Sequence, residues 1–382
     1  MRILQCVGDI DPALGGSVEA ARQLSIALNE LGHTADLLTL SEPREAWKRD
    51  WRGKIHSVGP SSTYYLYNPR LAAWVAENAA RYDAVVIHGL WRYTGFGVWR
   101  GLRALGVPYF VFAHGMLDPY FRRAFPWKHV KKYLCWLAAE RRVLRDARAV
   151  LFTCEEERLR AHRTFWPYQC QEQVVGLGIR GPSGYAGLEK HAFLSAFPSL
   201  AAKRIVLSLG RIHPKKGCDL LIEGFARVAA ADPQMHLVLA GPDECGWRAH
   251  LERLARQRGI EARITWTGPL YGEMKWGAMR AAEVFAVPSH IENFGITIAE
   301  AMSCGVPVLI SDQVNIWREI QADEAGFVAP ADKEGATSLL TRWLAASGRQ
   351  RQHMKDNALA CFRSRFDLHR FAGRFVECLE PL

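Results

Sequence analysis

A strand-like run followed by a helix-like stretch repeats along the chain, and this pattern constrains the fold more than any other feature. The runs in the first half are short, apolar and rich in β-branched and aromatic residues: 2–7, 35–40, 84–88, 109–113 and 149–153. Between the first two runs, residues 16–32 carry apolar side chains at helical spacing and end at Gly32. Strands that alternate with helices predict a buried parallel sheet with helices on both faces.

The same pattern starts again in the second half of the chain. Its runs are 204–210, 235–241, 264–268, 284–288 and 306–311. Residues 181–200 between the halves are dense in Gly, Pro and Ser, which is typical of a linker region. A chain of 382 residues is also longer than one ordinary core supports. We therefore predict an α/β protein with two Rossmann-like domains whose parallel sheets face each other across a cleft.

The expected domain boundaries follow from this division. Residues 1–185 are predicted to form an acceptor-side domain, and residues 186–362 a domain that binds a nucleotide sugar. The last segment, 363–382, is expected to be a helix that packs back on the first domain.

Composition excludes several other classes of protein. No run of about 18 consecutive apolar residues occurs, so no membrane span is expected. The N-terminal stretch shows no secretory signal. The nine cysteines are scattered without a Cys-x-x-Cys pair, which favours reduced thiols and a cytoplasmic protein.

Ligands of such sheets bind beyond the carboxyl ends of the strands, so chemistry is expected directly after the runs. The segment LSLGRIHPKKG, 207–217, places Arg211 after a strand and Lys216 at the entrance of the next helix. Two cations at a helix N-terminus suit a diphosphate, because the free N–H groups and the helix dipole favour the same anion. The alternative interpretation is a solvated basic loop.

The segment HIENFGITIAEAMSCGVP, 290–307, carries two glutamates in an otherwise apolar stretch. Glu300 lies among apolar residues, so its carboxylate needs a cation or a pair of ligand hydroxyls, such as those of a ribose. Glu292 would then face whatever extends beyond the phosphates, and Gly295 lets backbone approach a ligand closely. The alternative is a capping box formed by Thr297 and Glu300, which would make Glu300 structural.

These two motifs together resemble glycosyltransferase family 4, whose members are retaining enzymes of the GT-B fold. The resemblance rests on Gly210, Arg211, Lys216 and Gly217, followed by Glu-Asn-Phe-Gly-x4-Glu at 292–300. It is specific over residues 204–330, looser in the N-terminal half, and closest in character to bacterial surface-polysaccharide and lipopolysaccharide glycosyltransferases.

The resemblance implies roles for particular residues. Arg211 and Lys216 match the pair that holds the diphosphate of a sugar nucleotide. Glu300 matches the ribose-binding glutamate, and Glu292 matches the glutamate that addresses the donor sugar. The backbone at Phe294 and Gly295 would line the phosphate and sugar pocket.

In the N-terminal half, the resemblance concerns a glycine loop and a histidine. Gly15 and Gly16 resemble the family's loop after the first strand, where the next helix could present N–H groups to a phosphate. His114 matches a histidine near the transferred sugar. His88 also ends a strand and precedes a glycine, so the sequence ranks the two histidines only through the family. The expected catalytic residues are therefore His114, Glu292, Arg211 and Lys216.

No metal or other cofactor is expected. Asp9 and Asp11 form an Asp-x-Asp pattern, but loop acids near a helix N-terminus explain it adequately. A nicotinamide-dependent oxidoreductase is disfavoured, because the turn after the first strand lacks Gly-x-Gly-x-x-Gly.

The predicted function is transfer of a hexose, with retention, from a nucleotide-diphosphate sugar to a hydroxyl of a glycan or lipid-linked acceptor in surface polysaccharide synthesis. The alternatives are a sugar-nucleotide epimerase or hydrolase of the same fold, and a non-catalytic carbohydrate or lipid binder.

Residues 121–150 carry nine Lys or Arg against two acids, most of the net charge of +10. On a helix, Val130 and Leu134 share one face near Phe125, together with Leu137, and basic residues flank that face. Trp127, Tyr133 and Trp136 are expected at its border. This composition predicts docking on an anionic membrane, as a peripheral protein of the inner face. The alternative is a core helix with a solvated basic face, and nucleic acid is not an expected partner.

Overall fold

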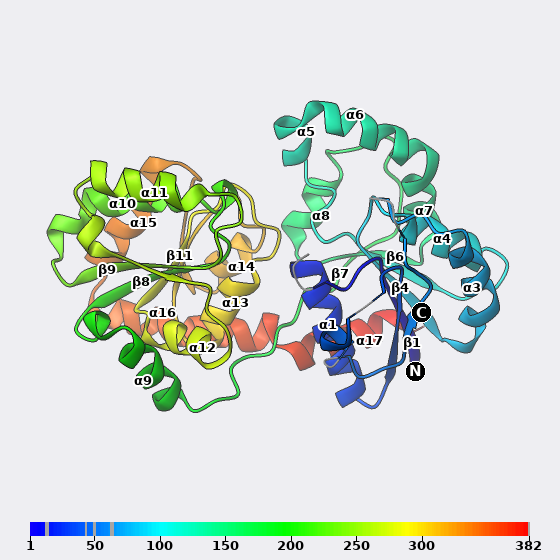
Figure 1. Cartoon of the computed structure of the whole chain (residues 1–382), viewed down its shortest axis with the longest axis horizontal. Coiled ribbons are helices and arrows are strands. Elements are labelled where there is room, and N and C mark those ends of the chain that lie inside the picture. Colours follow the sequence, from blue (N-terminus) through cyan, green and yellow to red (C-terminus); the bar gives the residue numbers. More distant parts are fainter. Residues whose placement is uncertain (12–14, 43, 49–50, 62–64, 381–382) are drawn as a thin grey trace. The chain divides into compact units, whose positions relative to one another are not determined.

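The structure is a computed structural model that describes residues 1–11, 15–42, 44–48, 51–61 and 65–380. The chain forms two compact units (Figure 1). The first contains Met1–Gly178 and Leu368–Leu382, and the second contains Ile179–Asp367. The chain therefore leaves the first unit once and returns to it for the last helix.

The first unit is built on a seven-stranded parallel sheet in the order β3-β2-β1-β4-β5-β6-β7. Its strands are β1 (Arg2–Val7), β2 (Thr34–Thr39), β3 (Ile55–Ser57), β4 (Ala84–His88), β5 (Tyr109–Phe112), β6 (Ala149–Phe152) and β7 (Glu172–Val174). Its helices are α1 (Gly16–Glu30), α2 (Glu45–Lys48), α3 (Arg70–Asn78), α4 (Tyr93–Leu102), α5 (Tyr120–Ala124), α6 (Pro126–Cys135), the π-helical turn η3 (Trp136–Glu140), α7 (Arg141–Asp146), α8 (Glu155–Ala161) and α17 (Leu368–Leu379).

The second unit is built on a six-stranded parallel sheet in the order β10-β9-β8-β11-β12-β13. Its strands are β8 (Arg204–Leu209), β9 (Met235–Ala240), β10 (Ile264–Gly268), β11 (Val284–Val287), β12 (Val308–Ser311) and β13 (Gly326–Ala329). Its helices are α9 (Ala186–Ala196), α10 (Cys218–Val228), α11 (Trp247–Gln257), α12 (Gly272–Ala281), α13 (Ile296–Ser303), α14 (Trp317–Ala322), α15 (Lys333–Ala345) and α16 (Gly348–Cys361).

Both sheets confirm the predicted Rossmann-like architecture. All residues of β4, β5 and β6 are buried, as are those of β9, β11 and β12, because helices cover both faces of each sheet. In each sheet the chain order reverses beside one strand: β1 has β2 and β4 as neighbours, and β8 has β9 and β11. Such a reversal is where sheets of this type bind ligands, beyond the carboxyl ends of the strands.

The last helix, α17, packs on α1 in the first unit, as the red and dark blue ribbons of Figure 1 show. Its Phe375 ring stacks on Phe112 of β5, with the ring centroids 5.9 Å apart. Phe371 and Phe375 are both fully buried, so α17 supplies part of the core of this unit. Of the helices described, none is both long and apolar enough to cross a bilayer.

Candidate active site

The site in the second unit begins where β8 ends. Gly210 follows the strand, and a short 3-10 turn, Pro214–Lys216, leads into α10. Gly217 joins the turn to the helix with φ of 66°, and a Cβ there would lie 2.2 Å from the carbonyl oxygen of Pro288. Only glycine fits this junction. Its close approach brings the Lys216 turn against the segment that follows β11.

Two backbone hydrogen bonds fix the position of Glu292 in that segment. Its N–H donates to the carbonyl of Gln313 at 3.0 Å, and its carbonyl accepts the N–H of Asn315 at 2.9 Å. The Glu292 carboxylate forms an ion pair with the Lys216 ammonium, and both side chains are largely buried. The structure therefore brings together two residues that are 76 positions apart and that the sequence assigned to the diphosphate and the donor sugar.

Glu300 lies one turn inside α13 and is 9% exposed. Gly295 is the N-cap of this helix, with φ of 78° and no side-chain cap, and Thr297 already lies inside the helix. The capping-box alternative is therefore wrong. The Glu300 carboxylate instead accepts a hydrogen bond from the Lys275 ammonium at 2.6 Å.

Lys275 is the residue of this site that the sequence analysis missed. It comes from α12, and its ammonium also lies over the ring of Trp276, 4.3 Å from the centroid. The buried Glu300 was expected to need a cation or ligand hydroxyls, and Lys275 meets that need in the structure without a ligand. A ligand that takes the Glu300 carboxylate must share it with this lysine.

Arg211 and Phe294, two further residues predicted for this site, take no part in the two ion pairs. The Arg211 guanidinium is more than half exposed and pairs with Glu244, which follows β9, at 3.1 Å. The Phe294 ring is buried and meets the Phe366 ring edge-on at 5.4 Å. Backbone, rather than the ring, is therefore the part of Phe294 that can line a site.

In the first unit, the N-terminus of α1 follows the carboxyl end of β1. Gly15 is its N-cap, with φ of 90°, and Gly16 is its first residue. A Cβ at Gly15 would meet no heavy atom within 4 Å in the described structure, so there is open space beside this N-cap residue. The preceding residues of the expected glycine loop, 12–14, lie outside the described residues.

His114 follows β5 in an unusual backbone conformation. Its φ is 48°, and that of Gly115 is 73°. A left-handed conformation is uncommon for histidine and needs support from its surroundings. The buried Glu157 carboxylate gives this support: it accepts the N–H of Gly115 at 2.5 Å, and the N–H and hydroxyl of Thr153 at 2.7 and 2.6 Å.

His88 and His114, which the sequence analysis could only rank against each other, are neighbours. His88 Nδ1 lies 3.0 Å from His114 Nε2, and His88 Nε2 lies 3.0 Å from Gln5 Oε1. Burial lowers the pKa of His114 to about 4 and the pKa of His88 well below its ordinary value. Both imidazoles are therefore neutral at neutral pH.

Asp9 and Asp11 make a local turn. The N–H of Asp11 donates to the Asp9 carboxylate at 3.1 Å. Within the described ranges, no group of three or more His, Cys, Asp or Glu side chains is arranged to hold a metal ion.

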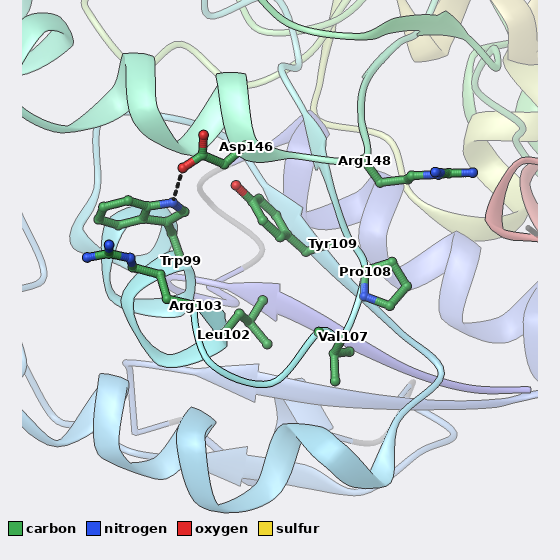
Figure 2. Close-up of a pocket in the computed structure, with 9 residues that line it drawn as sticks. Trp99, Leu102, Arg103, Val107, Pro108, Tyr109, Asp146 and Arg148 are labelled. Atoms are coloured by element: carbon green, nitrogen blue, oxygen red, sulfur yellow. Dashed lines mark hydrogen bonds between the residues drawn. The ribbon is translucent and has the colours of Figure 1, made fainter.

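A pocket of about 400 Å³ lies at the opposite end of the first sheet, where β5 and β6 begin. Figure 2 shows a hydrogen bond between two residues that line this pocket: the Trp99 indole N–H donates to the Asp146 carboxylate at 2.9 Å. The Tyr109 hydroxyl, also in this pocket, donates to the carbonyl of Val143 at 2.7 Å. Because the pocket opens at the amino ends of the strands, we assign it no role in the site.

Residues 121–150, which carry most of the net positive charge, contain an exposed apolar surface that we call the α6 surface. Its large side chains are 40–83% exposed: Phe125, Trp127, Val130, Leu134 and Leu137. The prediction for Trp136 is wrong, because its ring is fully buried and stacks on Phe165 at 5.1 Å. Trp136 is two residues after Leu134, about 200° around the helix, so its ring faces the core while Leu134 faces solvent.

Two parallel sheets of Rossmann-like topology in one chain are typical of the GT-B class of fold. The structure of Anabaena Alr3699/HepE in complex with UDP is similar over 99% of both chains, with a TM-score of 0.79 and 18% identity. The structure of WaaG, a glycosyltransferase involved in lipopolysaccharide biosynthesis, is similar over 100% of both chains, with a TM-score of 0.71 and 18% identity.

Sequence comparison gives the family. The family model "Glycosyl transferases group 1" matches residues 195–360, and the model "Glycosyl transferase 4-like domain" matches residues 15–176. The chain belongs to the glycosyltransferases, of the family 4 type with the GT-B fold. A curated relative, D-inositol 3-phosphate glycosyltransferase of Mycolicibacterium gilvum, is 41% identical over 111 residues, which are 28% of this chain and 24% of that protein. The chain thus matches about a quarter of the length of this relative.

Proposed function

We propose that the protein transfers a hexose, with retention of configuration, from a nucleotide-diphosphate sugar to a hydroxyl of its acceptor. The observation that carries this proposal is the pairing of Lys216 with Glu292 and of Lys275 with Glu300. Lys216 follows β8 and both glutamates follow β11, the strands beside the reversal of chain order, whereas Lys275 reaches the site from α12, after β10. A sugar nucleotide supplies partners for both kinds of charge, since its phosphates are anionic and its hydroxyls donate hydrogen bonds.

In the proposed mechanism, Lys216 and Arg211 bind the diphosphate. Negative charge on the leaving phosphate grows as the bond to the sugar breaks, so these cations stabilise the transition state more than the ground state. Glu300 accepts hydrogen bonds from the ribose hydroxyls, and Glu292 addresses the sugar. The departing phosphate oxygen accepts the proton of the incoming hydroxyl, so no separate base is required.

A thermal-shift screen with UDP, GDP and ADP tests the donor assignment. A ligand at a hundred times its dissociation constant stabilises the folded protein by about 2.7 kcal/mol, so the matching nucleotide is expected to raise Tm by several degrees. The same screen on Arg211→Ala should show a smaller rise. If none of the three nucleotides changes Tm, the donor assignment fails. Release of free sugar at the same rate with and without glycan acceptors would indicate a hydrolase instead.

The α6 surface supports a proposal about the acceptor. Its apolar side chains are exposed beside Lys128 and Lys131, both of which are exposed too. Apolar groups that enter a bilayer interface with lysines beside them are typical of helices that lie on anionic membranes, and each basic residue adds about 1 kcal/mol. We infer a peripheral enzyme of the inner membrane face that glycosylates a lipid-linked acceptor in surface polysaccharide synthesis.

Sedimentation with liposomes tests this inference. The protein is expected to pellet with anionic liposomes and much less with neutral ones. Trp127→Ser combined with Leu134→Ser should abolish pelleting, because the two side chains are 83% and 66% exposed on the α6 surface. Tyr185→Ser is the matched control, since Tyr185 is 82% exposed on the second unit. Equal and negligible pelleting of the unsubstituted protein with both liposomes would point to a soluble acceptor.

A further inference from the structure

Three polar side chains form a hydrogen-bonded row along the carboxyl edge of the first sheet. Gln5, His88 and His114 belong to β1, to the end of β4 and to the turn after β5, and these strands are direct neighbours in the sheet. Gln5 is opposite Val86 in the register, two residues before His88, so its side chain reaches His88 diagonally. Both contacts in the row are 3.0 Å long.

Gln5 determines which atom donates and which accepts in each hydrogen bond of the row. The Gln5 amide is placed with Oε1 toward His88 Nε2, and its nitrogen is buried without a hydrogen-bond partner in the described residues. Because an amide oxygen can only accept a hydrogen bond, this orientation puts a proton on His88 Nε2. A neutral imidazole with its proton on Nε2 has a lone pair on Nδ1, and this atom accepts from His114 Nε2. The proton of His114 is thereby placed on Nε2, and its Nδ1 keeps a lone pair.

The rings have little freedom to leave this arrangement. Phe112 stacks on both imidazoles, with centroids 5.4 Å from His88 and 5.3 Å from His114, each at an interplanar angle of 16°. The turn that carries His114 is fixed through Gly115 by the Glu157 carboxylate. His114 is partly buried, and within the described chain its Nδ1 has no hydrogen-bond partner. It is therefore open to a ligand.

We propose that Gln5 and His88 are positioning residues that hold His114 in its Nε2–H tautomer and so present Nδ1 as a neutral acceptor to a sugar hydroxyl at the carboxyl edge of the first sheet. The identity of that hydroxyl group rests on the proposed function, whereas the tautomer does not. A neutral acceptor suits transfer from a nucleotide sugar, because positive charge grows on the sugar ring as the leaving group departs. An imidazolium at the same place would oppose that charge.

The tautomer can be read without any substrate by NMR of protein labelled with ¹⁵N-histidine. Protonated and unprotonated ring nitrogens have well-separated shifts, and the spectrum of His114→Ala assigns the His114 signals. We expect Nε2 protonated and Nδ1 unprotonated in both His88 and His114. A proton on His114 Nδ1 would mean that the Gln5 amide is reversed, and it would overturn the proposal.

Gln5→Met tests the positioning role, because methionine keeps the volume but removes the acceptor. We expect the His114 signals to show a mixture of tautomers. Turnover should fall about fivefold, the effect of one neutral hydrogen bond, while affinity for the nucleoside diphosphate stays within twofold. Cys6→Ala is the matched control: Cys6 is the next residue of the same buried strand and points to the other face of the sheet, so tautomer and turnover should not change.

The outcomes separate the two proposals. An unchanged tautomer and unchanged turnover in Gln5→Met would overturn the positioning role. If Gln5→Met does not fold, the spectrum of the unsubstituted protein still decides the tautomer. Should that spectrum be as expected while no nucleotide sugar is consumed, the hydrogen-bonded row stands and the transferase assignment fails.

Discussion

Lys216→Met is expected to weaken the binding of a nucleoside diphosphate ten- to a hundredfold. The Lys216 side chain is 24% exposed and forms its ion pair with Glu292 in the structure without ligand. A hydrogen bond between charged groups contributes about 1.5–3 kcal/mol, which corresponds to this change in affinity. Isothermal titration calorimetry with the nucleotide that gives the largest thermal shift measures it. Lys215→Met is the matched control, since it removes the same charge from the neighbouring position.

Glu292→Gln should change the two readouts in opposite directions. Removing this carboxylate frees Lys216 for phosphate and removes a negative charge from the site, so diphosphate affinity is expected to rise a few-fold. Transfer should nevertheless fall at least tenfold, because the group proposed to address the sugar is lost. If Glu292→Gln weakens the diphosphate as much as Lys216→Met does, the ion pair is a structural element of the site and not a competitor of the ligand.

The sequence predicted the central strands of both sheets because they are buried on both faces. It missed β3, β7 and β13, which lie at sheet edges, are three or four residues long and have mostly part-exposed side chains. A short strand of this kind has no continuous apolar run, and its place is decided by pairing with a neighbour that is distant in sequence. Pattern analysis therefore loses three of the four edge strands of these sheets, whereas the fourth, β10, was predicted from its run at 264–268.

The candidate site was predictable where position along the chain determines position in space. Lys216 and Glu292 follow strand ends, so their approach could be expected from the topology of a parallel sheet. Lys275 could not be found in this way, because its contact with Glu300 depends on how α12 and α13 pack. The link between His88 and His114 was likewise hidden, although His88 ends β4 and His114 follows the neighbouring strand β5, because it depends on the left-handed turn at His114.

Glu140 is a buried carboxylate that lies outside both sequence motifs, 207–217 and 290–307. It ends the π-helical turn η3 and is fully buried. Its Oε1 accepts the N–H of Trp91 at 3.0 Å, and its Oε2 has no hydrogen-bond partner in the described residues. Burial raises the pKa of Glu140 from 4.5 to about 7, although the Trp91 hydrogen bond and the charge of Lys132 act in the opposite direction.

This raised pKa makes folding stability depend on pH. Between about 4.5 and 7 the folded protein holds the Glu140 proton more tightly than the unfolded chain does, so the contribution of this group is complete below pH 4.5 and is lost as pH rises through 7. The full loss is about 3 kcal/mol, since one unit of pKa difference corresponds to about 1.4 kcal/mol. Glu140→Gln keeps an oxygen for Trp91 and cannot ionise, so it should remove most of this dependence.

Urea unfolding at pH 5.5 and pH 8 measures the effect as a difference in the free energy of unfolding. The unsubstituted protein carries the Glu140 contribution together with those of all other titrating groups, so the comparison with Glu140→Gln isolates it. We expect the variant to gain stability relative to the unsubstituted protein on going from pH 5.5 to pH 8. Glu77→Gln, at an exposed position of α3, is the control and should leave the difference between the two pH values unchanged. If Glu140→Gln shifts the stability equally at both pH values, Glu140 does not titrate in this range, and its carboxyl group acts only through the hydrogen bond to Trp91.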